Sequence, residues 1–207
     1  MDFTDSIKYI EIASLITSVF YFKKYKSHFY IFFILYIIFA IVADFVGSLF
    51  EGENNYWVYD IYIFFEFGSL VGFYYSLIEK TKTKKTIIYL SLLFYLVYFL
   101  GFKYPVLLRF APIFSPFFVI PFIFFYLKEL LYSRKIINYK KILPFWLSVA
   151  LLIFYLGTLP FFSLLYLGNL DGRFLFNVVV FIVMIMHFIF ITSLNFILSR
   201  NQLYFII

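Results

Sequence analysis

Cysteine is absent from this 207-residue chain, and its absence excludes disulfide bonds, thiolate metal sites and cysteine nucleophiles together. Histidine is scarce, with only His28 and His187, and charged residues make up 14% of the chain. Glycine-rich phosphate loops and the Gly-x-Ser-x-Gly motif are also missing. The stretches between long apolar segments are all short, so we expect no soluble catalytic, nucleotide-binding or DNA-binding domain.

Apolar residues dominate what is present. They make up 65% of the chain, and the mean hydropathy is +0.98. A soluble domain is only about 45–50% apolar. A water-soluble core of this size cannot hide so much apolar surface, so the composition predicts an integral membrane protein.

Seven segments approach or reach the length of about 20 apolar residues that a membrane-spanning helix needs. The expected helices are residues 6–22, 29–50, 56–78, 86–102, 110–132, 142–167 and 174–198. Only helices satisfy their backbone polar groups internally in single runs of this length. We therefore predict an all-α fold, a seven-transmembrane-helix bundle that forms a single domain over residues 1–207.

Lysine and arginine cluster in alternate loops. The cations in the last turns of the first, third, fifth and seventh expected helices or after them are Lys23, Lys24, Lys26, Lys80, Lys82, Lys84, Lys85, Lys128, Arg134, Lys135, Lys140, Lys141 and Arg200. The opposite side has only Lys8, Lys103, Arg109 and Arg173. Because cytoplasmic loops carry the excess of Lys and Arg, we predict an outside N-terminus and an inside C-terminus. The expected location is a cell membrane that the chain crosses several times, such as a bacterial inner membrane or a plasma membrane. Basic cytoplasmic loops that face anionic lipid headgroups explain the net charge of +6, so nucleic acid is not an expected partner.

The third expected helix carries a carboxyl group, Glu66, near its middle. An ionisable side chain at that depth costs about 3 kcal/mol or more, which makes it a functional-site hypothesis by default. At 100° per residue, Asn55, Tyr59, Tyr62 and Glu66 fall within a sector of about 80°. Asp60 lies off this stripe. The stripe should therefore face the interior of the bundle.

Other helices offer polar groups that could meet Glu66. With the predicted orientation, Glu11, Asp44 and Asn177 lie in the outer half of the membrane, and His187 lies near the midplane with Glu66. We predict a polar pocket that opens outward and is closed below by Glu66 and His187. The candidate ligand-binding residues are Glu11, Asp44, Asn55, Tyr59, Tyr62, Glu66, Tyr155, Asn177 and His187.

A structural role for the same groups stays open, such as a protonated carboxyl group bonded to tyrosine or histidine. Interhelical hydrogen bonds of this kind contribute about 0.6 kcal/mol each. No cofactor and no metal ion are expected. Retinal would need a lysine in segment 174–198, and the three-histidine zinc hydrolases and two-histidine haem proteins need more intramembrane histidine than His187 alone.

Several motifs carry a resemblance to known membrane proteins. They are Ala43-Asp44-Phe45-Val46-Gly47; Asn54-Asn55-Tyr56-Trp57-Val58-Tyr59 with Tyr62 and Glu66-Phe67; Phe145-Trp146 with Tyr155 and Gly157; and Asn177. Through them the chain resembles a family of uncharacterised bacterial seven-helix integral membrane proteins, which implies a shared polar pocket and no established activity. It is also faintly similar to the lysoplasmalogenase-like membrane enzymes, through Asp44 in a glycine-containing helix. Those enzymes have eight spans and a Lys-Pro motif near the start, which this chain lacks.

Three functions fit these features. The first is a receptor-like or sensory module for a small ligand, acting through a signalling partner in the membrane or on its cytoplasmic side. The second is an intramembrane lipid-modifying hydrolase; no residue is assigned as catalytic unless this holds, in which case Asp44, Glu66 and His187 are the candidates. The third is a small proton- or cation-coupled carrier in which Glu66 is protonated during the cycle. Membrane lipids surround the bundle in each case.

Overall fold

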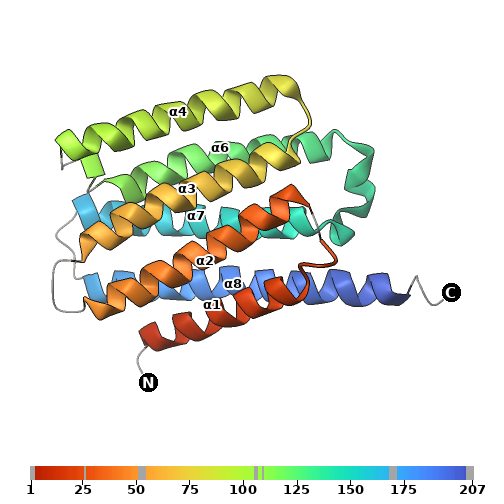
Figure 1. Ribbon diagram of the computed structural model, residues 1–207, viewed down its shortest axis with the longest axis horizontal. Helices are drawn as coiled ribbons and strands as arrows, with labels where there is room; N and C mark the ends of the chain where they lie inside the picture. Colours follow the sequence, from red (N-terminus) through yellow and green to blue (C-terminus); the bar gives the residue numbers. More distant parts are fainter. Residues whose placement is uncertain are drawn as a thin grey trace.

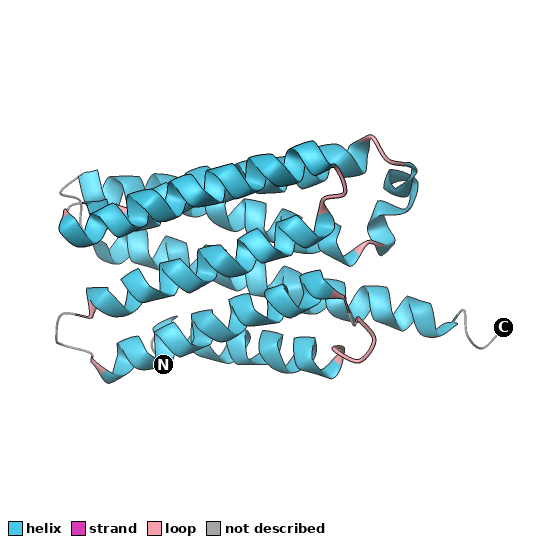
Figure 2. Cartoon of the chain, turned by 45° about the horizontal axis from the view of Figure 1, so that its top comes forward, coloured by secondary structure: helices cyan, strands magenta, loops and turns pink. Residues whose placement is uncertain are grey.

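The computed structural model describes residues 3–25, 27–50, 55–104, 107–108, 110–167 and 172–203, and every regular element in them is a helix (Figures 1 and 2). The elements are α1 (Phe3–Phe20), α2 (His28–Leu49), α3 (Tyr56–Leu77), α4 (Thr81–Lys103), α6 (Ala111–Leu131), the 3-10 helix η1 (Arg134–Lys141), α7 (Leu143–Leu167) and α8 (Gly172–Leu203). The all-α prediction is confirmed. The described part has eight helices rather than the expected seven, because the basic stretch after α6 forms η1.

Two helices are longer than hydropathy predicts. α4 begins at Thr81, five residues before the expected start, and α8 continues to Leu203. The added residues are mostly polar or charged. Lysine, arginine and glutamine are good helix formers, so a helix can continue past its apolar segment. Lys26 and Arg109, two cations of the topology prediction, lie outside the described residues.

Five helices are long and apolar enough to cross a membrane: α2, α4, α6, Leu143–Leu164 of α7 and Leu175–Ile197 of α8. This supports a membrane protein. α1 and α3 are not among the five, so the expected count of seven apolar spans is not reached in the described chain. Both helices carry charged residues, such as Glu11 in α1 and Glu66 in α3, which lower their hydropathy.

Six of the α-helices form a ring, and α4 packs against its flank. Neighbours in the ring follow the order α1, α2, α3, α6, α7, α8 and back to α1, while α4 contacts α3 and α6. Consecutive α-helices run in opposite directions along the bundle (Figure 1). The loops that follow α1, α3 and α6 therefore meet at one end, called here the basic end because most lysines of the chain lie there.

Aromatic rings fill the interior and also cover the outside. Phe67 of α3 stacks on Phe94 of α4 with 3.7 Å between ring centroids, and Phe33 of α2 meets Phe190 of α8 edge to face. Outward side chains such as Phe117 are more than half exposed. A surface this apolar is stable against lipid rather than water.

Tyrosine hydroxyls join adjacent helices and also the pair α3 and α7, which α6 separates in the ring. The interhelical bonds are Tyr30 to the Ser18 carbonyl (2.8 Å), Tyr74 to Ser148 Oγ (3.3 Å), Tyr95 to the Phe64 carbonyl (3.3 Å), Tyr98 to the Asp60 carbonyl (2.9 Å) and Tyr155 to Glu66 Oε1 (2.8 Å). Tyr21, just after α1, likewise donates to Asn195 of α8 at 3.0 Å. Lipid offers a hydroxyl no partner, so these bonds favour the packed bundle over separated helices.

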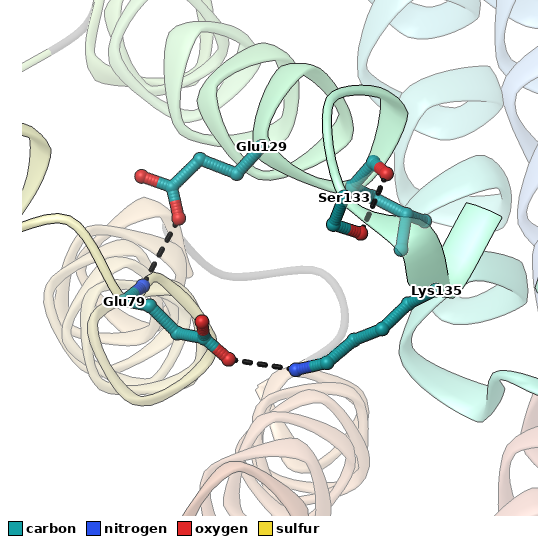
Figure 3. Close-up of polar contacts among 5 residues, drawn as sticks. Glu79, Glu129, Ser133 and Lys135 are labelled. Atoms are coloured by element: carbon teal, nitrogen blue, oxygen red, sulfur yellow. Dashed lines mark hydrogen bonds and ion pairs between the residues drawn. The ribbon is translucent and has the colours of Figure 1, made fainter.

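A polar network joins three elements at the basic end (Figure 3). The backbone N–H of Glu79, just after α3, donates to Oε2 of Glu129 in α6 at 3.0 Å. Lys135 Nζ of η1 lies 2.7 Å from Glu79 Oε1. The hydrogen bond and the positive charge of Lys135 lower the pKa of Glu79 below its ordinary value. The network fixes where α3 ends relative to α6 and η1.

The substitution Lys135→Gln is expected to raise the pKa of Glu79 toward its ordinary value. Because the folded pKa is depressed, the pair stabilises the fold above the pKa of an unfolded glutamate and loses this effect as pH falls through the folded pKa. The change in stability should be small, since both side chains are exposed. Carbon-13 NMR titration of the glutamate side chains measures the pKa, with Lys140→Gln as the control. An unchanged Glu79 titration in Lys135→Gln contradicts the ion pair.

The bond between Tyr74 and Ser148 can be measured by a double-mutant cycle. Tyr74→Phe and Ser148→Ala should show a coupling energy of about 0.6 kcal/mol, and at most about 1.7 kcal/mol. Unfolding in mixed micelles with increasing sodium dodecyl sulfate gives the free energies. Tyr89→Phe, at a 69% exposed side chain, is the control and should leave stability unchanged. A coupling of zero would show that this bond does not hold α3 to α7.

Candidate functional site

Glu66 lies in the interior of the bundle, where two tyrosine hydroxyls donate to the same carboxyl oxygen. Tyr155 of α7 donates to Oε1 at 2.8 Å, and Tyr62, one turn earlier on α3, donates at 3.1 Å. Glu66 is 5% exposed and Tyr155 is 2% exposed. A carboxyl group at this depth needs such donors, because burying it without partners would cost several kcal/mol.

A second buried pair joins α1 to α8. His187 Nε2 lies 3.9 Å from Glu11 Oε1, which is within ion-pair range but too long for a hydrogen bond. Both side chains are buried. His187 Nδ1 has no hydrogen-bond partner in the described part of the chain, and neither has Ser14 Oγ, one turn from Glu11 on α1. Unpaired buried polar atoms are rare in native proteins and call for an explanation.

Tyr36 of α2 interacts both with Glu66 and with the pair formed by Glu11 and His187. It is buried and interacts electrostatically with both Glu66 and Glu11. Its hydroxyl lies 3.5 Å from the sulfur of Met186, next to His187 in the chain. The sequence reasoning missed Tyr36. It lies eight residues before Asp44, about 80° away around an ideal helix, so the helical pattern of α2 offered no clear signal for it.

The buried polar side chains Glu66, Tyr36, Glu11 and His187, with the residues beside them, are called here the cluster. The cluster becomes more exposed toward the end of the bundle where α1 begins. Asp44 of α2 is half-buried, and it interacts with Glu11, which repels it, and with Lys8, which attracts it. Tyr59 of α3 also interacts electrostatically with Asp44 and Glu11, although its side chain is 38% exposed. The polar groups therefore run from the half-buried Asp44 to the enclosed Glu66.

Gly47 lets α3 approach α2 at this end. A Cβ atom at Gly47 would lie 2.9 Å from the hydroxyl oxygen of Tyr59, so a larger residue would force the tyrosine away. The Gly47 carbonyl accepts a hydrogen bond from Asn55 Nδ2 at 3.2 Å. Asn55 and Tyr59 thus hold the ends of α2 and α3 together beside Asp44, which gives Asn55 a structural role.

Eight of the nine candidate residues lie in or beside this cluster, and Asn177 does not. The Asn177 side chain is exposed on α8. It lies ten residues before His187, a rotation of about 80° on an ideal helix, and that angle carries it out of the interior when His187 faces inward. Asn177 is therefore not part of the buried cluster, and its role in a pocket that opens outward stays a prediction. Whether the other eight bind a ligand stays a prediction.

Carboxyl groups of the cluster suit a ligand with hydrogen-bond donors or positive charge, and His187 Nδ1 can donate or accept. In the described residues, no group of three or more His, Asp or Glu side chains could hold a metal ion. No family model, curated protein or solved structure matches this chain. The site must therefore be interpreted from its own geometry.

The two tyrosine donors of Glu66 should differ in importance. Tyr155→Phe is expected to lower the unfolding free energy by about 1–3 kcal/mol, because it leaves a buried acceptor short of a donor and removes the link between α3 and α7. Tyr62→Phe should cost less, since Tyr62 donates at longer distance within its own helix. Detergent unfolding measures both, with the exposed Tyr9→Phe as the control. Equal losses would contradict the importance of the interhelical link.

Proposed function

We propose that the chain is a receptor-like or sensory membrane module that binds a small ligand in the cluster around Glu11, His187 and Glu66. It crosses a bacterial inner membrane seven times, with the N-terminus outside and the C-terminus inside. Support comes from α1 and α3, which are 18 and 22 residues long and pack beside the apolar helix α2 in an alternating bundle. The lysine-rich loops at the basic end favour a cytoplasmic position for that end of the bundle.

The unpaired Nδ1 of His187 is the observation that carries this proposal. The side chain is 1% exposed, and the nearest carboxyl oxygen, on Glu11, lies beyond hydrogen-bond distance of its other nitrogen. A ligand group placed there would satisfy an atom that the protein leaves without a partner. Glu11, Asp44 and Glu66 favour a ligand with a positive charge or several hydrogen-bond donors.

The contacts of α8 suggest how binding is transmitted. α8 meets α1 at two levels, through His187 and Glu11 in the interior and through Asn195 and Tyr21 nearer the basic end. A ligand between Glu11 and His187 would change the first contact and bias how α1 packs on α8. α8 continues to Leu203 at the basic end, where a signalling partner would sense the shift.

Ligand screening tests this function. Purified protein in detergent is screened by thermal shift against small amines, amides and polyamines, and hits are measured by calorimetry. A ligand of the cluster should bind saturably, without turnover. Its affinity should fall at least about tenfold in Glu66→Gln or Glu11→Gln, which corresponds to about 1.4 kcal/mol for each lost charge-assisted contact. Asp60→Asn is the matched control, since this carboxyl group of α3 lies outside the cluster.

Two outcomes contradict the proposal. Equal affinity for every hit in wild type, Glu66→Gln and Glu11→Gln removes the cluster as the binding site. Turnover of a lipid extract that is abolished in both Asp44→Asn and Glu66→Gln replaces the sensory function with the intramembrane hydrolase.

A further inference from the structure

A groove runs along the side of the bundle near its basic end, apart from the cluster around Glu66. It has a volume of about 750 Å³ and is lined by the start of α2, the second half of α3 and the start of α4. Figure 1 shows these three segments toward the end of the bundle at which the C-terminus lies. Phe29, Phe32, Val71 and Ile88 give the groove an apolar wall.

Glycines on α3 shape the groove. Gly68 and Gly72 lie one turn apart on α3, and both line it. A Cβ atom at Gly72 would lie 2.4 Å from the ring of Phe32, so the ring packs directly against the α3 backbone. A side chain at Gly72 would push Phe32 outward. The two glycines therefore keep this apolar groove between α2 and α4.

Cationic and polar groups gather at the basic end of this groove. Lys84 of α4 lines it, with its ammonium 4.9 Å from the ring centroid of Tyr75, and His28 of α2 also lines it. The neighbouring acidic group, Glu79, already binds Lys135 at 2.7 Å. The N-cap of α2 makes no side-chain hydrogen bond, which leaves the positive end of that helix dipole uncapped.

We propose that this groove binds one membrane phospholipid with an anionic headgroup. The headgroup phosphate lies at Lys84 and His28, and an acyl chain lies along Phe29, Phe32 and Val71. Charge complementarity supports this occupant, because one end of the groove is cationic and the rest is apolar. Its volume falls within the range of about 300–1,000 Å³ typical of ligand sites. The inference does not depend on the function proposed for the Glu66 cluster.

Native mass spectrometry of the detergent-purified protein tests the site. The protein is titrated with dioleoyl phosphatidylglycerol or, separately, with the zwitterionic dioleoyl phosphatidylcholine. One phosphatidylglycerol should bind with clear preference over phosphatidylcholine. Lys84→Gln should weaken its binding about fivefold, because a lysine at an anionic lipid surface contributes about 1 kcal/mol. Lys128→Gln, which removes a cation of α6 outside the groove, is the matched control and should change binding little.

A second variant tests the apolar part without removing charge. Val71→Phe fills the groove and should also weaken phosphatidylglycerol binding severalfold, whereas Val19→Phe, on a lipid-facing position of α1, should not. Excess inorganic phosphate should compete poorly, since it lacks the acyl chain. Circular dichroism and size exclusion confirm that each variant is folded.

Three results would overturn the proposal. Equal retention of the two lipids means that bound lipid is adventitious. Loss of binding in Lys128→Gln as strong as in Lys84→Gln means that general surface charge is responsible. A protein dimer without bound lipid that Val71→Phe converts to a monomer means that a second copy of the chain fills the groove.

Discussion

Every polar side chain inside this bundle must find its partner in the protein, because lipid supplies none. The structure meets this requirement mainly with tyrosine. Tyr30 joins α2 to α1, while Tyr74 and Tyr155 both join α3 to α7, and their rings fill the space between the helices. The same side chain therefore provides apolar packing and a hydrogen bond. The residues that fail the requirement, above all His187, are those most in need of a functional explanation.

The ring of six helices determines which groups can meet. α1 and α8 close the ring, so Glu11 and His187 become neighbours although the chain separates them by nearly its whole length. α3 lies between α2 and α6 and also touches α4. Its inward face then carries Glu66 toward Tyr36 of α2 and Tyr155 of α7. This helix order brings the carboxyl groups of Glu11 and Glu66 to buried positions.

In the described residues, hydropathy predicted most ends of the seven longer α-helices to within a few residues, because most apolar runs end where polar loops begin. It failed at the start of α4 and at η1, where lysine-rich sequence is helical without being apolar. Helical angles brought Tyr62 and Glu66 to one face correctly. They could not indicate that Tyr36 would join them or that Asn177 would turn outward, since a single sequence gives faces but not the order of neighbours around the bundle.

The contact between Glu66 and Tyr155 also bears on how the protein is made. Tyr155 follows Glu66 by 89 residues, so α3 is synthesised well before α7. During that interval Tyr62, on the same helix, is the one hydroxyl donor to Glu66 among the described residues. We expect this carboxyl group to stay protonated or close to water until α7 arrives, because an ionised carboxylate is costly in lipid. A chain that ends before α7 would therefore lack the interhelical donor of Glu66, and the interior is complete only when the C-terminal half is in place.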